Sequence, residues 1–276
     1  ITKNDKVKWS REKYPNGWGA DLVCAPSFKL KLSSTFLNDI DNCLRRLQQK
    51  NKNAEAIEKK DFSSPAIDEG MEQILHEVRT GTGLVIMQGL DSNKYTPEEL
   101  ELIYFGMGMH LGNAVSQSSY GDLLGHVAVK DKTSARGYTS DRQLDLHTDS
   151  AEIIALMCVR KAVSGGASVF ASSLKIHDII KHERPDLLGV LVNGYPYHRR
   201  GEEAPGAEPI TPYRIPVFSE VDGLVSCRYV REIIEVGYRD LGAELGGIEK
   251  EALDFFDEVS NRENVKFEYQ LEEGEI

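Results

Sequence analysis

A histidine and an aspartate lie one residue apart in the segment "RQLDLHTDSAEIIALMC" (142–158), directly before a strongly apolar run. In an extended chain, residues i and i+2 project to the same side, so the His147 imidazole and the Asp149 carboxylate can converge on one cation. These groups are two of the three ligands of the 2-His-1-carboxylate triad, which leaves positions on Fe(II) open for a cosubstrate and dioxygen. The spacing therefore favours an iron site at His147 and Asp149.

The pair alone is a weak indicator, because a core or hairpin histidine oriented by a nearby aspartate has the same spacing. With seven histidines in the chain, one such pair is unremarkable by chance. The following sequence, "AEIIALMCVRKAVSGGASVFASS" (151–173), predicts a strand, a turn at Gly165-Gly166 and a second strand. The pair would then stand at the start of a rigid sheet element, as a preorganised site requires.

The surrounding elements follow from hydrophobic periodicity and capping residues. Helices are predicted at 34–50, 67–80, 97–110, 173–192 and 248–261. Strands are predicted at 81–90, 125–130, 152–160, 167–172, 195–198, 214–218, 224–228 and 265–271. Many short strands with peripheral helices favour a mainly β fold with flanking helices, built on a double-stranded β-helix (jelly roll) core. No composition shift marks a domain boundary, so we expect residues 1–276 to form a single domain.

Charge and composition narrow the class of partner. The chain has 33 Lys and Arg against 44 Asp and Glu, a formal net charge of −11, with no basic block that could follow a phosphate backbone. A small-molecule substrate is therefore favoured over nucleic acid. No apolar stretch approaches the roughly 20 residues that a membrane span needs, so no membrane partner is expected. Assembly into a homo-oligomer is left open.

The cysteines indicate a reducing environment. Cys24, Cys43, Cys158 and Cys227 lie far apart and form no CxxC pair, which argues against a zinc knuckle and against a dense disulfide framework. We therefore expect a soluble, cytoplasmic protein.

Several motifs in order resemble one family. "LDLHTDSAE", "SGGASVFASS", "YPYHRRG", "RIPVFSEVDGLVSCRYVR" and "FEYQLEEGEI" resemble the TauD/TfdA branch of the Fe(II)/2-oxoglutarate-dependent oxygenases, from about Gly83 to the end of the chain. The resemblance implies that His147 and Asp149 are the first two iron ligands. It also implies that Ser168, in the family's "GGxT/S" pattern, helps to hold the carboxylate of the cosubstrate 2-oxoglutarate; the alternative is an ordinary strand hydroxyl.

The resemblance also implies the reaction. A family member would be a dioxygenase that oxidises an unactivated C–H bond of its substrate with dioxygen and releases succinate and CO2. Hydroxylation is the usual outcome, with desaturation or ring closure as variants.

The family's second histidine, in a stretch like "NxxxLHGR", and the arginine that pairs with 2-oxoglutarate are not found. "YQLEEGEI" (269–276) resembles the turn that precedes the strand bearing that histidine, so we expect the native protein to continue with this C-terminal strand. The competing interpretation is a naturally truncated relative without iron. His198 lies too early, beside Arg199 and Arg200, to replace the ligand, and a structural or lid role is favoured for it.

The sequence indicates the substrate-binding residues less clearly than the metal ligands. By the resemblance, Gln117, Gln143 and Tyr138 lie where the family lines its pocket, although polar loop residues would give the same pattern. Arg228 and Arg231 lie near a strand end and could clamp a substrate carboxylate bidentately, with an exposed ion pair as the alternative for each.

A small carboxylate- or amino-acid-like substrate is preferred on these grounds. Tyr195, Tyr197 and Tyr213 could instead line a pocket for a larger aromatic molecule, or fill the core.

Three other classes of function compete with this interpretation. A non-catalytic relative of the same fold would bind a small ligand without turnover. A hydrolase is disfavoured, because no G-x-S-x-G motif occurs and a Cys158 thiol paired with His147 would come from an apolar strand. JmjC-type and cupin metal sites also use His-x-Asp, but "GGAS" and "LEEGEI" favour the TauD/TfdA branch.

Overall fold

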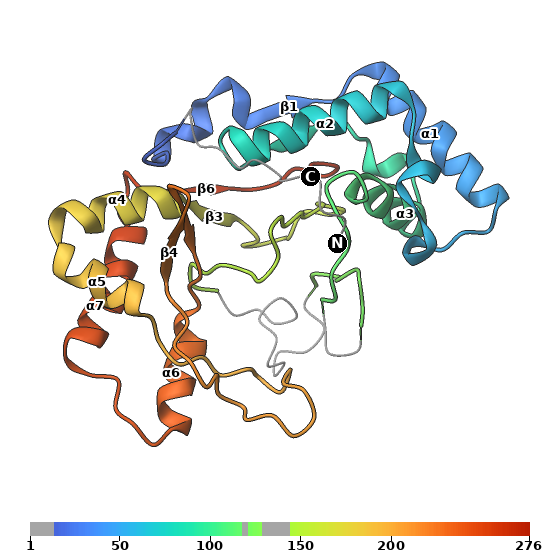
Figure 1. Cartoon of the computed structure of the whole chain (residues 1–276). Coiled ribbons are helices and arrows are strands. Elements are labelled where there is room, and N and C mark those ends of the chain that lie inside the picture. Colours follow the sequence, from blue (N-terminus) through green and yellow to red (C-terminus); the bar gives the residue numbers. More distant parts are fainter. Residues whose placement is uncertain (1–13, 118–120, 129–143) are drawn as a thin grey trace.

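Two groups of helices are joined by strands and extended segments that run between them (Figure 1). The computed structural model describes residues 14–117, 121–128 and 144–276. The first group contains α1 (Ser34–Gln49), α2 (Pro65–Thr80) and α3 (Pro97–Gly108). The second contains α4 (Ser173–Glu183), α5 (Pro185–Asn193), α6 (Arg231–Asp240) and α7 (Gly247–Ser260). Short 3-10 helices are η1 (Ala20–Cys24), η2 (Pro26–Phe28), η3 (Ala54–Ala56), η4 (Lys59–Phe62) and η5 (Ser92–Lys94).

The helices of the first group begin where the sequence caps them. The Ser33 and Ser64 hydroxyls accept hydrogen bonds from backbone N–H groups in the first turns of α1 and α2. Thr96 and Glu99 form a capping box at the start of α3, with Pro97 in the first position. These helices bury their apolar faces in one cluster that includes Ile40, Leu47, Ile67, Met71 and Ile103. The predicted helices at 34–50, 67–80 and 97–110 are confirmed within two residues at each end.

The second group differs from the prediction at two places. The helix expected at 173–192 is two helices, because the residue before a proline is driven out of the helical region, and Arg184 before Pro185 has φ −142° and ψ 67°. Helix α6 begins four residues after the end of a strand and was not predicted. The helix expected at 248–261 is α7.

The strands are short. β1 (Lys29–Lys31) pairs in parallel with β2 (Ile86–Gln88), and β3 (Ser168–Ala171) pairs antiparallel with β6 (Lys266–Tyr269). β4 (Phe218–Val221) and β5 (Leu224–Cys227) form a hairpin whose turn residues Asp222 and Gly223 have φ of 52° and 76°, as a type I′ turn requires.

The expectation of a mainly β chain is not confirmed, since helices hold many more of the described residues than strands do. Residues 152–160 form no assigned strand, and β3 pairs with β6 instead of forming the predicted hairpin. The backbone of Cys158 bonds instead to Gly274 and Glu275, while Ile276 pairs with Met87 next to it. The C-terminal residues thus lie between β2 and the 144–158 segment.

No helix in the described part of the chain has the length and apolarity to cross a membrane.

Two glycines of the α5 region provide a test of this packing. Gly194 ends α5 with φ +77°, and an added Cβ would lie 2.2 Å from the Ile215 carbonyl oxygen, whereas an added Cβ at Gly189 meets nothing within 4 Å. We expect Gly194→Ala to lower the free energy of unfolding by at least about 2 kcal/mol through strain and clash. Gly189→Ala should raise it by about 0.5–1 kcal/mol through helix propensity. Urea unfolding of both variants measures this, and equal effects would contradict the packing.

Candidate active site

The His147 ring is held in one orientation and one tautomer. Its Nδ1 lies 2.7 Å from the backbone oxygen of Asp145, and because a carbonyl oxygen only accepts, Nδ1 carries the hydrogen. The lone pair of the neutral ring is then on Nε2, the atom that would ligate a metal. A metal-binding histidine commonly donates its other N–H in this way.

The Nε2 atom faces the Asp149 carboxylate. The distance from Nε2 to Oδ1 is 3.9 Å, and the two side chains are 36% and 55% exposed. In this tautomer both atoms are acceptors, so no hydrogen bond joins them and a shared cation would stabilise the pair. Two ligand bonds of about 2.1 Å at a right angle put the donor atoms about 3.0 Å apart. A small rotation of the exposed Asp149 side chain would bring Oδ1 to this distance from Nε2, so the geometry of the pair fits a metal ion.

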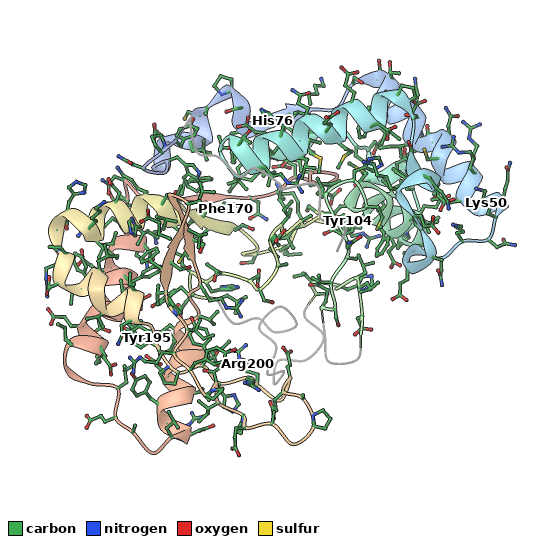
Figure 2. The ribbon with its side chains drawn as sticks, in the orientation of Figure 1. Lys50, His76, Tyr104, Phe170, Tyr195 and Arg200 are labelled. Carbon is green, nitrogen blue, oxygen red and sulfur yellow. The ribbon has the colours of Figure 1, made fainter. Side chains whose placement is uncertain are left out.

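The segment that carries the pair is fixed by backbone contacts on several sides. The Thr148 N–H donates to the Tyr229 carbonyl oxygen at 2.8 Å, and the Thr148 hydroxyl accepts from the Tyr229 N–H at 2.8 Å. Farther along, the Tyr104 hydroxyl of α3 donates to the Ala155 oxygen at 2.5 Å; Figure 2 shows Tyr104 beside this segment. The pair therefore lies between the two helical groups.

A third protein ligand is not found among the described residues. No group of three or more His, Cys, Asp and Glu side chains within residues 14–117, 121–128 and 144–276 could hold a metal ion. His198 is engaged at both nitrogens: Nδ1 accepts from the Arg200 N–H at 2.9 Å, and Nε2 lies 3.4 Å from Asp240. These contacts support the structural role that the sequence favours for His198.

Arg228 and Arg231, the two arginines predicted to bind a substrate carboxylate, differ in their charged partners. The Arg231 guanidinium lies 2.7 Å from Glu235, 2.8 Å from Asp254 and 3.0 Å from Asp257. The structure therefore favours the ion-pair alternative for Arg231. Arg228 is half-buried, and its guanidinium has no hydrogen bond or ion pair to the described residues. It lies next to Tyr229, which holds Thr148.

The other predicted site residues are less informative. Ser168 is half-buried on β3 opposite Tyr269, and the described residues show no contact between it and His147. The Gln117 amide donates to the Val115 oxygen at 3.0 Å and its side chain is exposed, which favours the polar-loop alternative. Tyr138 and Gln143 lie outside the described residues.

The three tyrosines and Cys158 test two alternative functions, a pocket for a large aromatic molecule and a cysteine hydrolase. Tyr195 and Tyr197 are buried in the core of the second helical group and donate to the backbone oxygens of Glu249 and Arg228; Figure 2 shows Tyr195 beside these helices. Tyr213 is exposed. Burial raises the pKa of the Cys158 thiol, which makes it a poor nucleophile at neutral pH. Neither a large aromatic pocket nor a cysteine hydrolase is supported.

Sequence comparison gives a family and two relatives. Residues 45–276 match the family described as "Taurine catabolism dioxygenase TauD, TfdA family". FR-33289 synthase from Streptomyces rubellomurinus is 34% identical over 212 residues, which are 74% of this chain and 61% of that protein. The taurine hydroxylase-like protein SAT17 from Stachybotrys chartarum is 23% identical over 282 residues, which are 97% of this chain and 70% of SAT17. This chain thus spans less than two thirds of the length of FR-33289 synthase.

Two solved structures have a similar fold. One is an asparagine oxygenase in complex with Fe(II), 3-hydroxyasparagine and succinate, with a TM-score of 0.59. The other is the non-heme iron oxygenase OrfP in complex with Fe and alpha-ketoglutaric acid, with a TM-score of 0.62. Each is 12% identical to this chain, and each match covers 90% of this chain and 83% of the other. The likeness confirms the fold of these oxygenases, which have a jelly-roll core.

The family match extends over most of the chain and includes the His-x-Asp pair, the Gly165-Gly166 pair before β3 and the C-terminal "LEEGEI" turn. The chain therefore belongs to the TauD/TfdA family of dioxygenases.

Proposed function

We propose that this chain is part of a non-haem Fe(II)/2-oxoglutarate-dependent oxygenase that oxidises an unactivated C–H bond of a small carboxylate- or amino-acid-like substrate. The observation that carries the proposal is the orientation of His147, whose Nδ1–H bonds the Asp145 oxygen so that the Nε2 lone pair faces Asp149. Family membership and the Fe- and 2-oxoglutarate-containing structural neighbours support the choice of metal and cosubstrate.

Bound Fe(II) and 2-oxoglutarate would supply the oxidising power, by reducing dioxygen as 2-oxoglutarate is converted to succinate and CO2. His147 and Asp149 would hold the metal on one side and leave the other side open for cosubstrate, dioxygen and substrate. The hydroxyl of Ser168 would bind a 2-oxoglutarate carboxylate. The proposal also requires a second histidine ligand and a cosubstrate arginine from sequence outside the described residues.

The preference for an anionic substrate rests on Arg228. A half-buried guanidinium without a carboxylate partner among the described residues is unusual in a chain with a net charge of −11. It lies one residue from Tyr229, whose backbone is hydrogen-bonded to Thr148 between the two proposed ligands. A substrate carboxylate could accept two parallel hydrogen bonds from this group.

A reducing, cytoplasmic setting is also proposed. All four cysteines are free thiols in the structure, as expected where disulfides do not persist.

Removing either proposed ligand tests the reaction. We expect His147→Ala and Asp149→Ala in the full-length protein to abolish succinate formation from 2-oxoglutarate with a substrate screened from small carboxylates, because two ligands no longer hold the metal. His182→Ala, which removes an exposed histidine of α4, should leave the rate unchanged. Circular dichroism should show that all three variants keep the fold. Retained succinate formation in the His147 or Asp149 variant would refute the proposed site.

The different roles of the two arginines can be separated by one substitution at each. Arg228→Gln should raise the KM for a carboxylate substrate about tenfold or more, because a charged hydrogen bond is lost, with the free energy of unfolding unchanged within about 0.5 kcal/mol. Arg231→Gln should lower that free energy by about 1–3 kcal/mol, since carboxylates of α6 and α7 lose their partner. Substrate kinetics and urea unfolding measure both effects. An unchanged KM in Arg228→Gln would remove this arginine from the substrate site.

A further inference from the structure

Thr148, between the two proposed ligands, is hydrogen-bonded to a residue that is distant in the sequence. Its backbone N–H and its hydroxyl bond the Tyr229 carbonyl oxygen and N–H, both at 2.8 Å. Within the described part of the chain, His147 hydrogen-bonds the Asp145 backbone oxygen, two residues away, and Asp149 is more than half exposed. The position of the pair relative to the rest of the protein therefore depends on Thr148 and Tyr229.

Tyr229 in turn is fixed to α7. Its side chain is 1% exposed, and its ring packs on Phe256 with centroids 4.0 Å apart. Its hydroxyl donates to Asp257 Oδ1 at 2.5 Å. A buried tyrosine hydroxyl with a charged acceptor sets the ring orientation more strictly than packing alone.

Asp257 is itself held in place by a charged partner. Its Oδ2 lies 3.0 Å from Arg231, and the same guanidinium contacts Asp254 and Glu235 at 2.8 and 2.7 Å. The side chain of Arg231 is 16% exposed, so the network is shielded from water on the arginine side. These contacts link α6 and α7 to Tyr229, whose side chain bonds Asp257 and whose backbone bonds Thr148, the residue between His147 and Asp149.

From these contacts we infer that Tyr229 and Asp257 are positioning residues for the metal site, acting through Thr148; the inference rests on the proposed function of His147 and Asp149 as metal ligands. A metal site needs its ligands held within about 0.5 Å of the bound geometry. Loss of a supporting contact outside the ligand set typically lowers metal affinity 10- to 100-fold. The contacts from Asp257 of α7 through Tyr229 to Thr148 would support both ligands, because Thr148 lies between them.

The first test compares two substitutions at Thr148 in the full-length protein. Mn(II) binds the same nitrogen and oxygen ligands as Fe(II), and the EPR signal of free Mn(II) reports how much metal is unbound. Thr148→Val removes the hydroxyl that accepts from the Tyr229 N–H, and we expect a Kd for Mn(II) at least about tenfold higher. Thr148→Ser keeps the hydroxyl and should restore the wild-type Kd.

The second test uses two buried tyrosines of the same core cluster. Tyr229→Phe removes the hydroxyl that bonds Asp257, while Tyr195→Phe removes one that bonds the Glu249 backbone oxygen at 3.0 Å. Both variants lose one buried hydrogen bond, and Tyr229→Phe should lose the more stability because its acceptor is charged. Only Tyr229→Phe should weaken Mn(II) binding, by about tenfold.

The outcomes distinguish a failure of this inference from a failure of the proposed metal site. If the wild-type protein binds Mn(II) and His147→Ala does not, the metal site stands. The inference is then overturned if Thr148→Val and Tyr229→Phe bind as tightly as wild type, or if Tyr195→Phe is weakened as much as Tyr229→Phe. If the wild-type protein binds Mn(II) no better than His147→Ala, the proposed metal site fails, and the inference fails with it.

Discussion

The hydrogen bond from His147 Nδ1–H to the Asp145 oxygen is the constraint on which the candidate site depends. It decides which ring nitrogen has the lone pair, and it points that nitrogen at Asp149. With the other tautomer, an Nε2–H would face the carboxylate and the two residues would form an ordinary hydrogen-bonded pair. The local backbone fold over 145–149 is therefore what would let this common pair of residues bind a metal, as proposed.

The rest of the structure holds that short segment still. Tyr104 of α3 bonds it on one side, the backbone of Tyr229 bonds it on another, and Cys158 pairs with the C-terminal turn. All three anchors come from residues more than 50 positions away in the sequence. Because the segment has no regular strand of its own within the described residues, these contacts replace the sheet ladder that was expected around it.

The sequence predicted what depends on local chemistry. Hydrophobic periodicity located α1 and α2, the capping box at Thr96 located α3, and the i, i+2 spacing located the candidate ligands. Periodicity alone could not show that Pro185 divides a helix. The roles of Arg228 and Arg231 could not be separated either, because the carboxylates that occupy Arg231 include Asp254 and Asp257 of α7, which are distant in sequence. Tyr229 lies in the quoted segment "RIPVFSEVDGLVSCRYVR", but nothing in that segment points to Thr148 or Asp257, and only the fold connects the three residues.

The central claim is that His147 and Asp149 bind iron together with 2-oxoglutarate. The most direct measurement is an anaerobic titration of the full-length protein with Fe(II) and then 2-oxoglutarate, followed by visible absorption spectroscopy. The account predicts a charge-transfer band that grows with 2-oxoglutarate and is absent without Fe(II). A full-length protein that shows no such band at saturating Fe(II) and 2-oxoglutarate would contradict it and would favour a relative that binds a small ligand without turnover.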